Sequence, residues 1–284
     1  MFTLNCKGRL LTIDEPIVMG IINVTPDSFY HRSRADTEMQ ILRKAEQMLL
    51  EGAAILDLGG QSTRPGSTLI SAGEELQRLI PAIELIIKNF PDAIISVDSF
   101  YARVAKLAIE AGGAIINDIS GGHIDPEIIP LAAQMRVPYI CMHMRGTPQT
   151  MNDFTSYKDL MGEITDYFIE RIRVCQDAGI HDLILDPGIG FSKTIAQNFE
   201  ILNAIPVLKI PGKPLLIGVS RKGTIYKTLG IDAEKALNGT TVLNTIAILN
   251  GASILRVHDV KEALEAVKLC SEIKKASFRM EEGL

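Results

Sequence analysis

Short apolar runs rich in β-branched residues recur eight times along the chain, and amphipathic segments of helical length separate several of them. The runs cover residues 17–22, 54–58, 93–97, 114–116, 137–142, 183–185, 215–219 and 253–257. Because apolar residues dominate them, these runs suit parallel strands that are covered on both faces. A helical period of apolar residues predicts helices at 38–50, 76–87, 104–111, 164–178 and 260–273.

This alternation predicts an α/β protein, and eight strand–helix units of similar length favour a (β/α)8 TIM barrel. An open, doubly wound parallel sheet is the alternative. Residues 2–4 and 9–13 flank a polar turn and predict an N-terminal β-hairpin at the bottom of the barrel. A length of 284 residues is compatible with two domains, but barrels of this size fold as one. No linker interrupts the chain, so we predict a single domain over residues 1–284.

Charge and cysteine content narrow the class of protein. There are 34 acidic and 29 basic residues, whereas proteins that track a nucleic-acid backbone are usually basic, so we expect no nucleic-acid partner. Cys6, Cys141, Cys175 and Cys270 form no closely spaced pair, and the first residues lack a signal-peptide pattern, which predicts a cytoplasmic protein. The uncharged stretch 236–255 is long enough to cross a bilayer, but its asparagines and glycines favour a buried helix, a turn and a strand. We therefore expect no membrane segment.

Polar residues stand at the carboxyl end of every predicted strand. In barrels of this kind the active site lies on the loops at these strand ends. A single buried Asp or Asn in such a place could simply cap a loop, but eight strands ending this way favour one shared polar site. In chain order the residues are Asn23, Asp57, Asp98, Asn117 with Asp118, His143, Asp186, Ser220 with Arg221 and Lys222, and Arg256 with His258.

The cations among these residues follow the last two strands, where barrel enzymes commonly bind phosphate. Ser220, Arg221 and Lys222 also precede a predicted helix at 224–229, whose amino end would favour an anion. Arg64 adds a further cation from the second loop. The alternatives are an ion pair between Arg256 and Asp259 and a Lys222 side chain that is merely exposed to solvent.

The carboxylates and the asparagine amide at the strand ends suggest that they bind a part of the ligand other than its phosphate. Asp57, Asp98, Asn117 and Asp186 offer acceptors to a heterocycle with several N–H donors, since unpaired buried acceptors are costly. For a metal, one isolated histidine is weak evidence for zinc. A Mg²⁺ ion held by Asn23 together with ligand phosphates is favoured, because Mg²⁺ prefers oxygen ligands.

Five motifs, in the same order along the chain, resemble those of the dihydropteroate synthase family of pterin-binding enzymes. They are residues 23–29 (NVTPDSF), 57–66 (DLGGQSTRPG), 185–191 (LDPGIGF), 220–222 (SRK) and 256–259 (RVHD). The similarity extends over about residues 16–273. It implies a TIM-barrel transferase of folate biosynthesis that joins 6-hydroxymethyl-7,8-dihydropterin diphosphate to 4-aminobenzoate, giving 7,8-dihydropteroate and pyrophosphate. It also implies a homodimer that forms through helices near the carboxyl end.

The same resemblance implies roles for individual residues. The pterin edge would be held by Asp98, Asn117, Asp186 and Lys222, with Met142 and Arg256 against the ring faces. The diphosphate would be bound by Asn23, Arg64, Arg256 and His258, with Mg²⁺ at Asn23. The aminobenzoate pocket would be formed by Phe29, Thr63, Pro65, Phe191 and Lys222. The catalytic set is predicted to be Asn23, Arg64, Asp98, Lys222, Arg256 and His258, and Ser220 is counted among the substrate-binding residues.

Two positions depart from the family pattern. Residues 30–33 read Tyr-His-Arg-Ser where the family commonly has Ser-Asp-Gly-Gly, so the acidic residue of the first loop is missing. Gly223 replaces a serine whose hydroxyl is associated with the aminobenzoate carboxylate, which predicts weakened binding of that group. Two other functions stay open: a methyltetrahydrofolate methyltransferase, which shares the pterin-binding barrel, and a non-catalytic pterin-binding paralogue.

Overall fold

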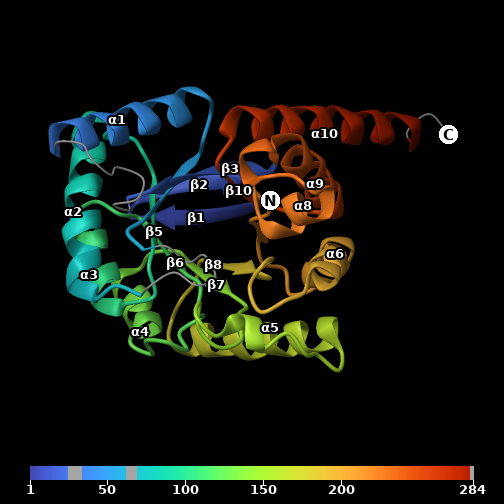
Figure 1. The fold of residues 1–284 in the computed structure, drawn as a ribbon, viewed down its shortest axis with the longest axis horizontal. Coiled ribbons are helices and arrows are strands. Elements are labelled where there is room, and N and C mark those ends of the chain that lie inside the picture. The colour runs from blue at the N-terminus through green and yellow to red at the C-terminus, as the bar shows by residue number, and fades with distance from the viewer. Residues whose placement is uncertain (25–33, 62–68, 282–284) are drawn as a thin grey trace.

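A sheet of eight parallel strands forms the centre of the molecule in a computed structural model, which describes residues 1–24, 34–61 and 69–281 (Figure 1). The strands are β3 (Ile17–Asn23), β4 (Ile55–Gly59), β5 (Ile95–Asp98), β6 (Ile115–Asp118), β7 (Tyr139–Met142), β8 (Leu183–Asp186), β9 (Leu216–Ile217) and β10 (Ile254–Val257). Their order is β8-β7-β6-β5-β4-β3-β10-β9. Each strand lies close to one of the eight apolar runs, so all eight predicted strands are confirmed.

The two edge strands of this sheet meet and close the barrel. A single parallel bridge joins Leu185 to Leu215, and the amide of Leu185 donates to the carbonyl of Pro214 at 3.0 Å. This closure confirms the (β/α)8 barrel over the open sheet. The join between β8 and β9 is nevertheless short, because β9 contains only two residues.

Helices surround the strands on the outside of the barrel (Figure 1). They are α1 (Arg34–Leu50), α2 (Ala72–Asn89), α3 (Ala102–Glu110), α4 (Ile128–Met135), α5 (Leu160–Asp177), α6 (Ile195–Asn203), α7 (Ile205–Leu208), α8 (Gly223–Leu229), α9 (Leu237–Asn250) and α10 (Val260–Glu281). Short 3-10 turns lie at Met151–Asp153 and Ala233–Lys235. The five predicted amphipathic helices, the helix after Lys222 and the helix in the uncharged stretch are confirmed. Within the described ranges, no helix is long and apolar enough to cross a membrane.

The amino-terminal hairpin closes the bottom of the barrel, as predicted. β1 (Phe2–Cys6) and β2 (Arg9–Ile13) are antiparallel. Leu4, Cys6 and Ile13 are buried in one cluster with the first inward-facing residues of the barrel strands, such as Ile115 and Ile254. The apolar hairpin therefore fills the end of the barrel opposite to the strand carboxyl ends.

Strand register places the polar residues of the opposite end side by side. Across four neighbouring strands, Asn23 pairs with Gly59, Gly59 with Asp98, and Asp98 with Asn117. Farther round the barrel, Met142 pairs with Asp186. Because these positions share one level of the barrel, their side chains gather at its mouth.

Candidate active site

Arg256 lies between two carboxylates at the barrel mouth. Its Nε donates to Asp57 Oδ2 at 2.6 Å, and its Nη2 donates to Asp98 Oδ2 at 2.5 Å. The Asn117 amide donates to both carboxylate oxygens of Asp57 at 3.2 Å. Four strands thus contribute to one hydrogen-bonded cluster, and the alternative pairing of Arg256 with Asp259 is not found.

A second part of the mouth is formed by the turn after β8. Lys222 Nζ donates to the carbonyl of Ile189 at 2.5 Å and lies 4.7 Å from the centre of the Phe191 ring. Asp186, at the end of β8, accepts a hydrogen bond from the amide of Gly188 at 2.7 Å. Lys222 is therefore held in place by the protein and is not a solvated surface lysine.

His258 and Ser220 form the third part of the mouth. The Ser220 hydroxyl accepts from the backbone amide of His258 at 3.2 Å and lies 3.0 Å from His258 Nδ1. The hydroxyl can then donate to Nδ1, which leaves the imidazole proton on Nε2. Arg221 behaves differently from its neighbours, because its guanidinium binds the Asp259 carboxylate through two hydrogen bonds of 2.9 and 2.6 Å. Its charge is neutralised within the protein.

Burial shifts the pKa values of the groups at the mouth. It raises the pKa of Asp98 to about 7, although Arg256 opposes the shift, and it also raises the pKa of Asp186. The pKa of Lys222 is lowered to about 8, against the effect of Asp186. Burial together with nearby cations lowers the pKa of His258 to about 4, so this imidazole is neutral at physiological pH. Such perturbed groups are typical of a functional site.

The structure brings most of the predicted site residues together. Asn23 ends β3 at the level of the mouth described above. The other predicted residues that lie at this mouth are Asp98, Asn117, Met142, Asp186, Phe191, Ser220, Lys222, Arg256 and His258. Predictions for Phe29, Thr63, Arg64 and Pro65, and for the departure at residues 30–33, lie outside the described residues.

Sequence reasoning missed an apolar cluster at the mouth. Met142 was predicted to contact the ligand, but it also packs with Phe100, Ile119, Met144 and Met151. Phe191 lies against this cluster. Because Phe100, Ile119, Met144 and Met151 lie outside the five motifs, no signal in a single sequence separated them from ordinary core residues.

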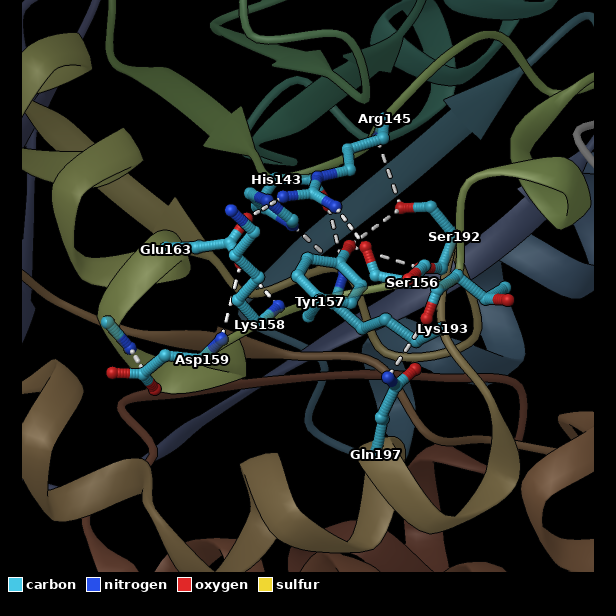
Figure 2. A network of polar contacts seen from close by, with 12 residues as sticks. His143, Arg145, Ser156, Tyr157, Lys158, Asp159, Glu163, Ser192, Lys193 and Gln197 are labelled. Atoms are coloured by element: carbon cyan, nitrogen blue, oxygen red, sulfur yellow. Dashed lines mark hydrogen bonds and ion pairs between the residues drawn. The ribbon is translucent and has the colours of Figure 1, made fainter.

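Sequence reasoning also missed a polar network beside the mouth, which Figure 2 shows. It connects the segment after β7 with the turn after β8. The Arg145 amide donates to the Ser192 hydroxyl at 3.0 Å, and the Tyr157 hydroxyl donates to the Ser192 carbonyl at 3.0 Å (Figure 2). Lys193 and His143 are in contact at its centre. Only His143 was noted from the sequence, as a polar residue at a strand end and as weak evidence for zinc.

Comparison with known proteins identifies the class of this barrel. The family described as pterin binding enzyme matches residues 19–258. A dihydropteroate synthase of Synechocystis is 43% identical over 259 residues, which cover 90% of this chain and 89% of the relative. The Escherichia coli dihydropteroate synthase is 40% identical over 265 residues, which cover 93% of each chain.

Solved structures agree with the sequence comparisons. A Yersinia pestis dihydropteroate synthase in a sulfonamide complex matches with a TM-score of 0.90 and 39% identity over 97% of this chain and 100% of that one. A Xanthomonas albilineans dihydropteroate synthase with 4-aminobenzoic acid matches with a TM-score of 0.88 and 38% identity, covering 96% and 98% of the two chains. The chain therefore belongs to the dihydropteroate synthase family of pterin-binding enzymes, which are transferases. This confirms the resemblance carried by the five motifs.

Proposed function

We propose that this chain transfers the methylene carbon of 6-hydroxymethyl-7,8-dihydropterin diphosphate to the amino nitrogen of 4-aminobenzoate. The C–O bond to the diphosphate breaks, a C–N bond forms, and the amine loses a proton, which gives 7,8-dihydropteroate and pyrophosphate. The observation that carries the proposal is the cluster in which Arg256 bridges Asp57 and Asp98 at the mouth of a barrel of this family. The cluster provides hydrogen-bond acceptors for a polar ring and a positive charge for the diphosphate.

For the pterin, we assign one edge to Asp98, Asn117, Asp186 and Lys222. The carboxylates accept N–H donors of the ring, and Lys222 donates to a ring acceptor. Met142 and Arg256 pack against the ring faces. Leaving such buried groups unpaired costs about 1–3 kcal/mol each, so a ring that satisfies them is selected over one that does not.

For the diphosphate, we assign Asn23, Arg64, Arg256 and His258, and Ser220 orients His258 by donating to its Nδ1. The neutral His258 imidazole can donate from Nε2, because Ser220 occupies Nδ1. These donors stabilise the negative charge that develops on the leaving group. The ionised carboxylates near the pterin favour the positive charge that develops at its methylene carbon as the C–O bond breaks.

The aminobenzoate pocket is assigned to Phe29, Thr63, Pro65, Phe191 and Lys222. Among them, Phe191 and Lys222 are within the described residues and are in contact. The aromatic ring and the ammonium group suit an aromatic carboxylate. Since no nucleophilic side chain is required, the amine attacks the methylene carbon directly.

A Mg²⁺ ion fits this arrangement through its oxygen ligands. Over residues 1–24, 34–61 and 69–281, no group of three or more His, Cys, Asp or Glu side chains could form a protein-only metal cage. The amide oxygen of Asn23 at the end of β3 suits an ion that is otherwise held by phosphate oxygens and water. When bound, Mg²⁺ would neutralise charge on the diphosphate.

The assay that tests the function measures pyrophosphate release from purified protein, pterin diphosphate, 4-aminobenzoate and Mg²⁺. Release with formation of dihydropteroate supports the proposal. Tight pterin binding without release would instead support the non-catalytic alternative, and methyl transfer from methyltetrahydrofolate would support the methyltransferase.

The order of bond breaking can be tested by rapid quench without aminobenzoate. If the C–O bond breaks before the amine attacks, a single turnover still releases pyrophosphate. A strict requirement for the amine would contradict early bond breaking and would leave the overall reaction intact.

We also propose a homodimer, because apolar residues are exposed along one stripe of α9, a helix near the carboxyl end. Val242, Ile246 and Leu249 on α9 have exposed fractions of 49%, 37% and 49%. Ile246→Glu should give a monomer in sedimentation velocity, and Leu107→Glu, on α3 with 38% exposure, should not. A monomeric unmodified protein would contradict the proposal.

We also propose that the protein acts in the reducing cytoplasm. This is supported by its four cysteines, which are all free and buried.

A further inference from the structure

Lys193 is a buried cation for which the proposed reaction has no role. Its exposed fraction is 8%, and within the described residues no carboxylate lies within ion-pair distance of its Nζ. Burying a lysine is costly unless its ammonium group is hydrogen-bonded. Lys193 Nζ contacts four acceptors: His143 Nδ1 at 3.0 Å and the carbonyls of His143 at 3.3 Å, Gly188 at 3.1 Å and Phe191 at 2.9 Å.

These acceptors lie in the segments that follow two different strands. His143 follows β7, whereas Gly188 and Phe191 begin and end the turn after β8. The turn is unusual, because Gly188, Gly190 and Ser192 have φ values of 67°, 83° and 48°. A side chain at Gly188 would also meet the carbonyl oxygen of His143, since an added Cβ would lie 2.1 Å from it. A backbone of this kind persists only where its surroundings hold it, and the Lys193 ammonium lies where the two segments meet.

Between the Gly188 and Phe191 carbonyls that Lys193 binds is Ile189, whose carbonyl accepts from Lys222 Nζ at 2.5 Å. Gly190 also lies beside the Lys222 side chain, since an added Cβ there would lie 3.1 Å from Lys222 Cδ. The Phe191 ring lies 4.7 Å from the same ammonium group. The position of Lys222 therefore depends on the geometry of a turn that Lys193 fixes.

Burial lowers the pKa of Lys193 to about 7, so its ammonium form predominates below that pH. Burial together with the neighbouring Lys193 and Arg145 lowers the pKa of His143 to about 2, so the imidazole is neutral. Its Nδ1 can then accept from Lys193, with the ring proton on Nε2. Figure 2 shows both side chains within the network that joins the two segments.

We propose that Lys193 is a positioning residue, which ties the end of β7 to the turn after β8 and thereby places Lys222 against the pterin and the aminobenzoate. The ligand assignment rests on the proposed function. The tie itself rests on the four contacts of Lys193 and on the turn that they enclose.

The test compares pterin binding in Lys193→Met, Lys222→Met, the double variant and a control. The control is Lys158→Met, which removes an exposed lysine of the same network region. With 6-hydroxymethyl-7,8-dihydropterin as the probe in calorimetry, Lys193→Met should weaken binding about tenfold, and Lys158→Met should leave it unchanged. In the double variant, the loss should equal that of Lys222→Met alone, because Lys193 acts through Lys222.

Two results would overturn the proposal: binding by folded Lys193→Met that matches the unmodified protein, or losses that multiply in the double variant. A purely structural role would lower the unfolding temperature without this non-additivity. If Lys193→Met does not fold, Lys193→Gln takes its place in the same comparison. Because glutamine retains two N–H donors, the expected loss of pterin affinity is smaller. Absence of pyrophosphate release by the unmodified chain would overturn the proposed reaction alone, because this test is read from pterin binding.

Discussion

Arg256 is the residue on which the geometry of the mouth depends. Its guanidinium is positively charged over the whole accessible pH range, and the two carboxylates raise its pKa further against the effect of burial. It fixes the orientation of Asp57 and Asp98, which come from adjacent strands. Asp57 is fully buried, so its negative charge is tolerated only because Arg256 and Asn117 bind it.

Asp57→Asn should therefore destabilise the protein. The amide keeps the shape of the side chain but removes the charge that Arg256 binds, while Asp98 remains as a second partner. We expect a loss of about 2–3 kcal/mol in the free energy of unfolding, measured in urea. Asp92→Asn, at an exposed position, is the control and should change it by less than about 0.5 kcal/mol. Equal stability of the two variants would contradict a structural role for the Asp57–Arg256 pair.

Asp98 should control the pH dependence of pterin use. Its pKa of about 7 lies above the ordinary 3.8, so the carboxyl is ionised, and able to accept two hydrogen bonds, only at higher pH. We expect kcat/KM for pterin diphosphate to fall as the pH decreases through 7. The effect on stability has the opposite sign, because the folded state binds this proton more tightly, so stability decreases as the pH rises from 3.8 to about 7. Persistence of the acid limb in the weakly active Asp98→Asn variant would exclude Asp98 as its origin.

Most of the polar residues that reach the mouth could be predicted from the sequence, but their pairing could not. Asp118 was expected there, but its carboxylate accepts from the amides of Ser120 and Gly122 and from the Tyr139 hydroxyl. Strand ends are local features, and the carboxyl ends of parallel strands share one side of a barrel. The partner of Arg256 is 199 residues away at Asp57, and the neighbour Asp259 binds Arg221 instead. Lys193 gave no signal, because three of its four partners are backbone carbonyls, which every residue has.

At the scale of single elements, the amino end of α8 gives a prediction about Gly223. An added Cβ would lie 3.5 Å from the Tyr226 hydroxyl and 3.6 Å from Lys227 Cε, which is ordinary contact, so a serine fits without strain. Gly223→Ser should lower the KM for 4-aminobenzoate about fivefold, the effect of one hydrogen bond worth about 1 kcal/mol.

The control for this prediction is Gly223→Ala, which adds the Cβ without the hydroxyl. It should leave the KM for 4-aminobenzoate near that of the unmodified protein. A higher KM in Gly223→Ser, or an equal decrease in Gly223→Ala, would show that the hydroxyl has no role in binding the carboxylate.

The helices missed from the sequence are short. α4 has eight residues and contains Pro130, α6 has nine residues and α7 has four, so each offers few turns in which an apolar period can be recognised. α6 did carry a local signal, the capping box of Thr194 and Gln197.

At the scale of the whole molecule, stability and chemistry lie at opposite ends of the barrel. Leu4 of the hairpin has 2% of its surface exposed and packs against the bottom of the barrel. Leu4→Ala should lower the free energy of unfolding by about 2–5 kcal/mol and leave the KM values for both substrates unchanged at low temperature. Leu10→Ala, in the same hairpin with 72% exposure, should affect neither quantity. Altered KM values in Leu4→Ala would show that the two ends are coupled.

The short join between β8 and β9 gives the ligand a structural role of its own. Asp186 is the last residue of β8, and Lys222 comes after β9. A pterin bound by both side chains, as proposed, would therefore connect two strands that are joined by few backbone hydrogen bonds. Hydrogen–deuterium exchange at the Leu185 amide should therefore slow when pterin binds, more than at Leu56 within the β4–β5 pairing. Equal protection at both amides would contradict this. The bound substrate would then reinforce the barrel where its closure has the fewest backbone hydrogen bonds.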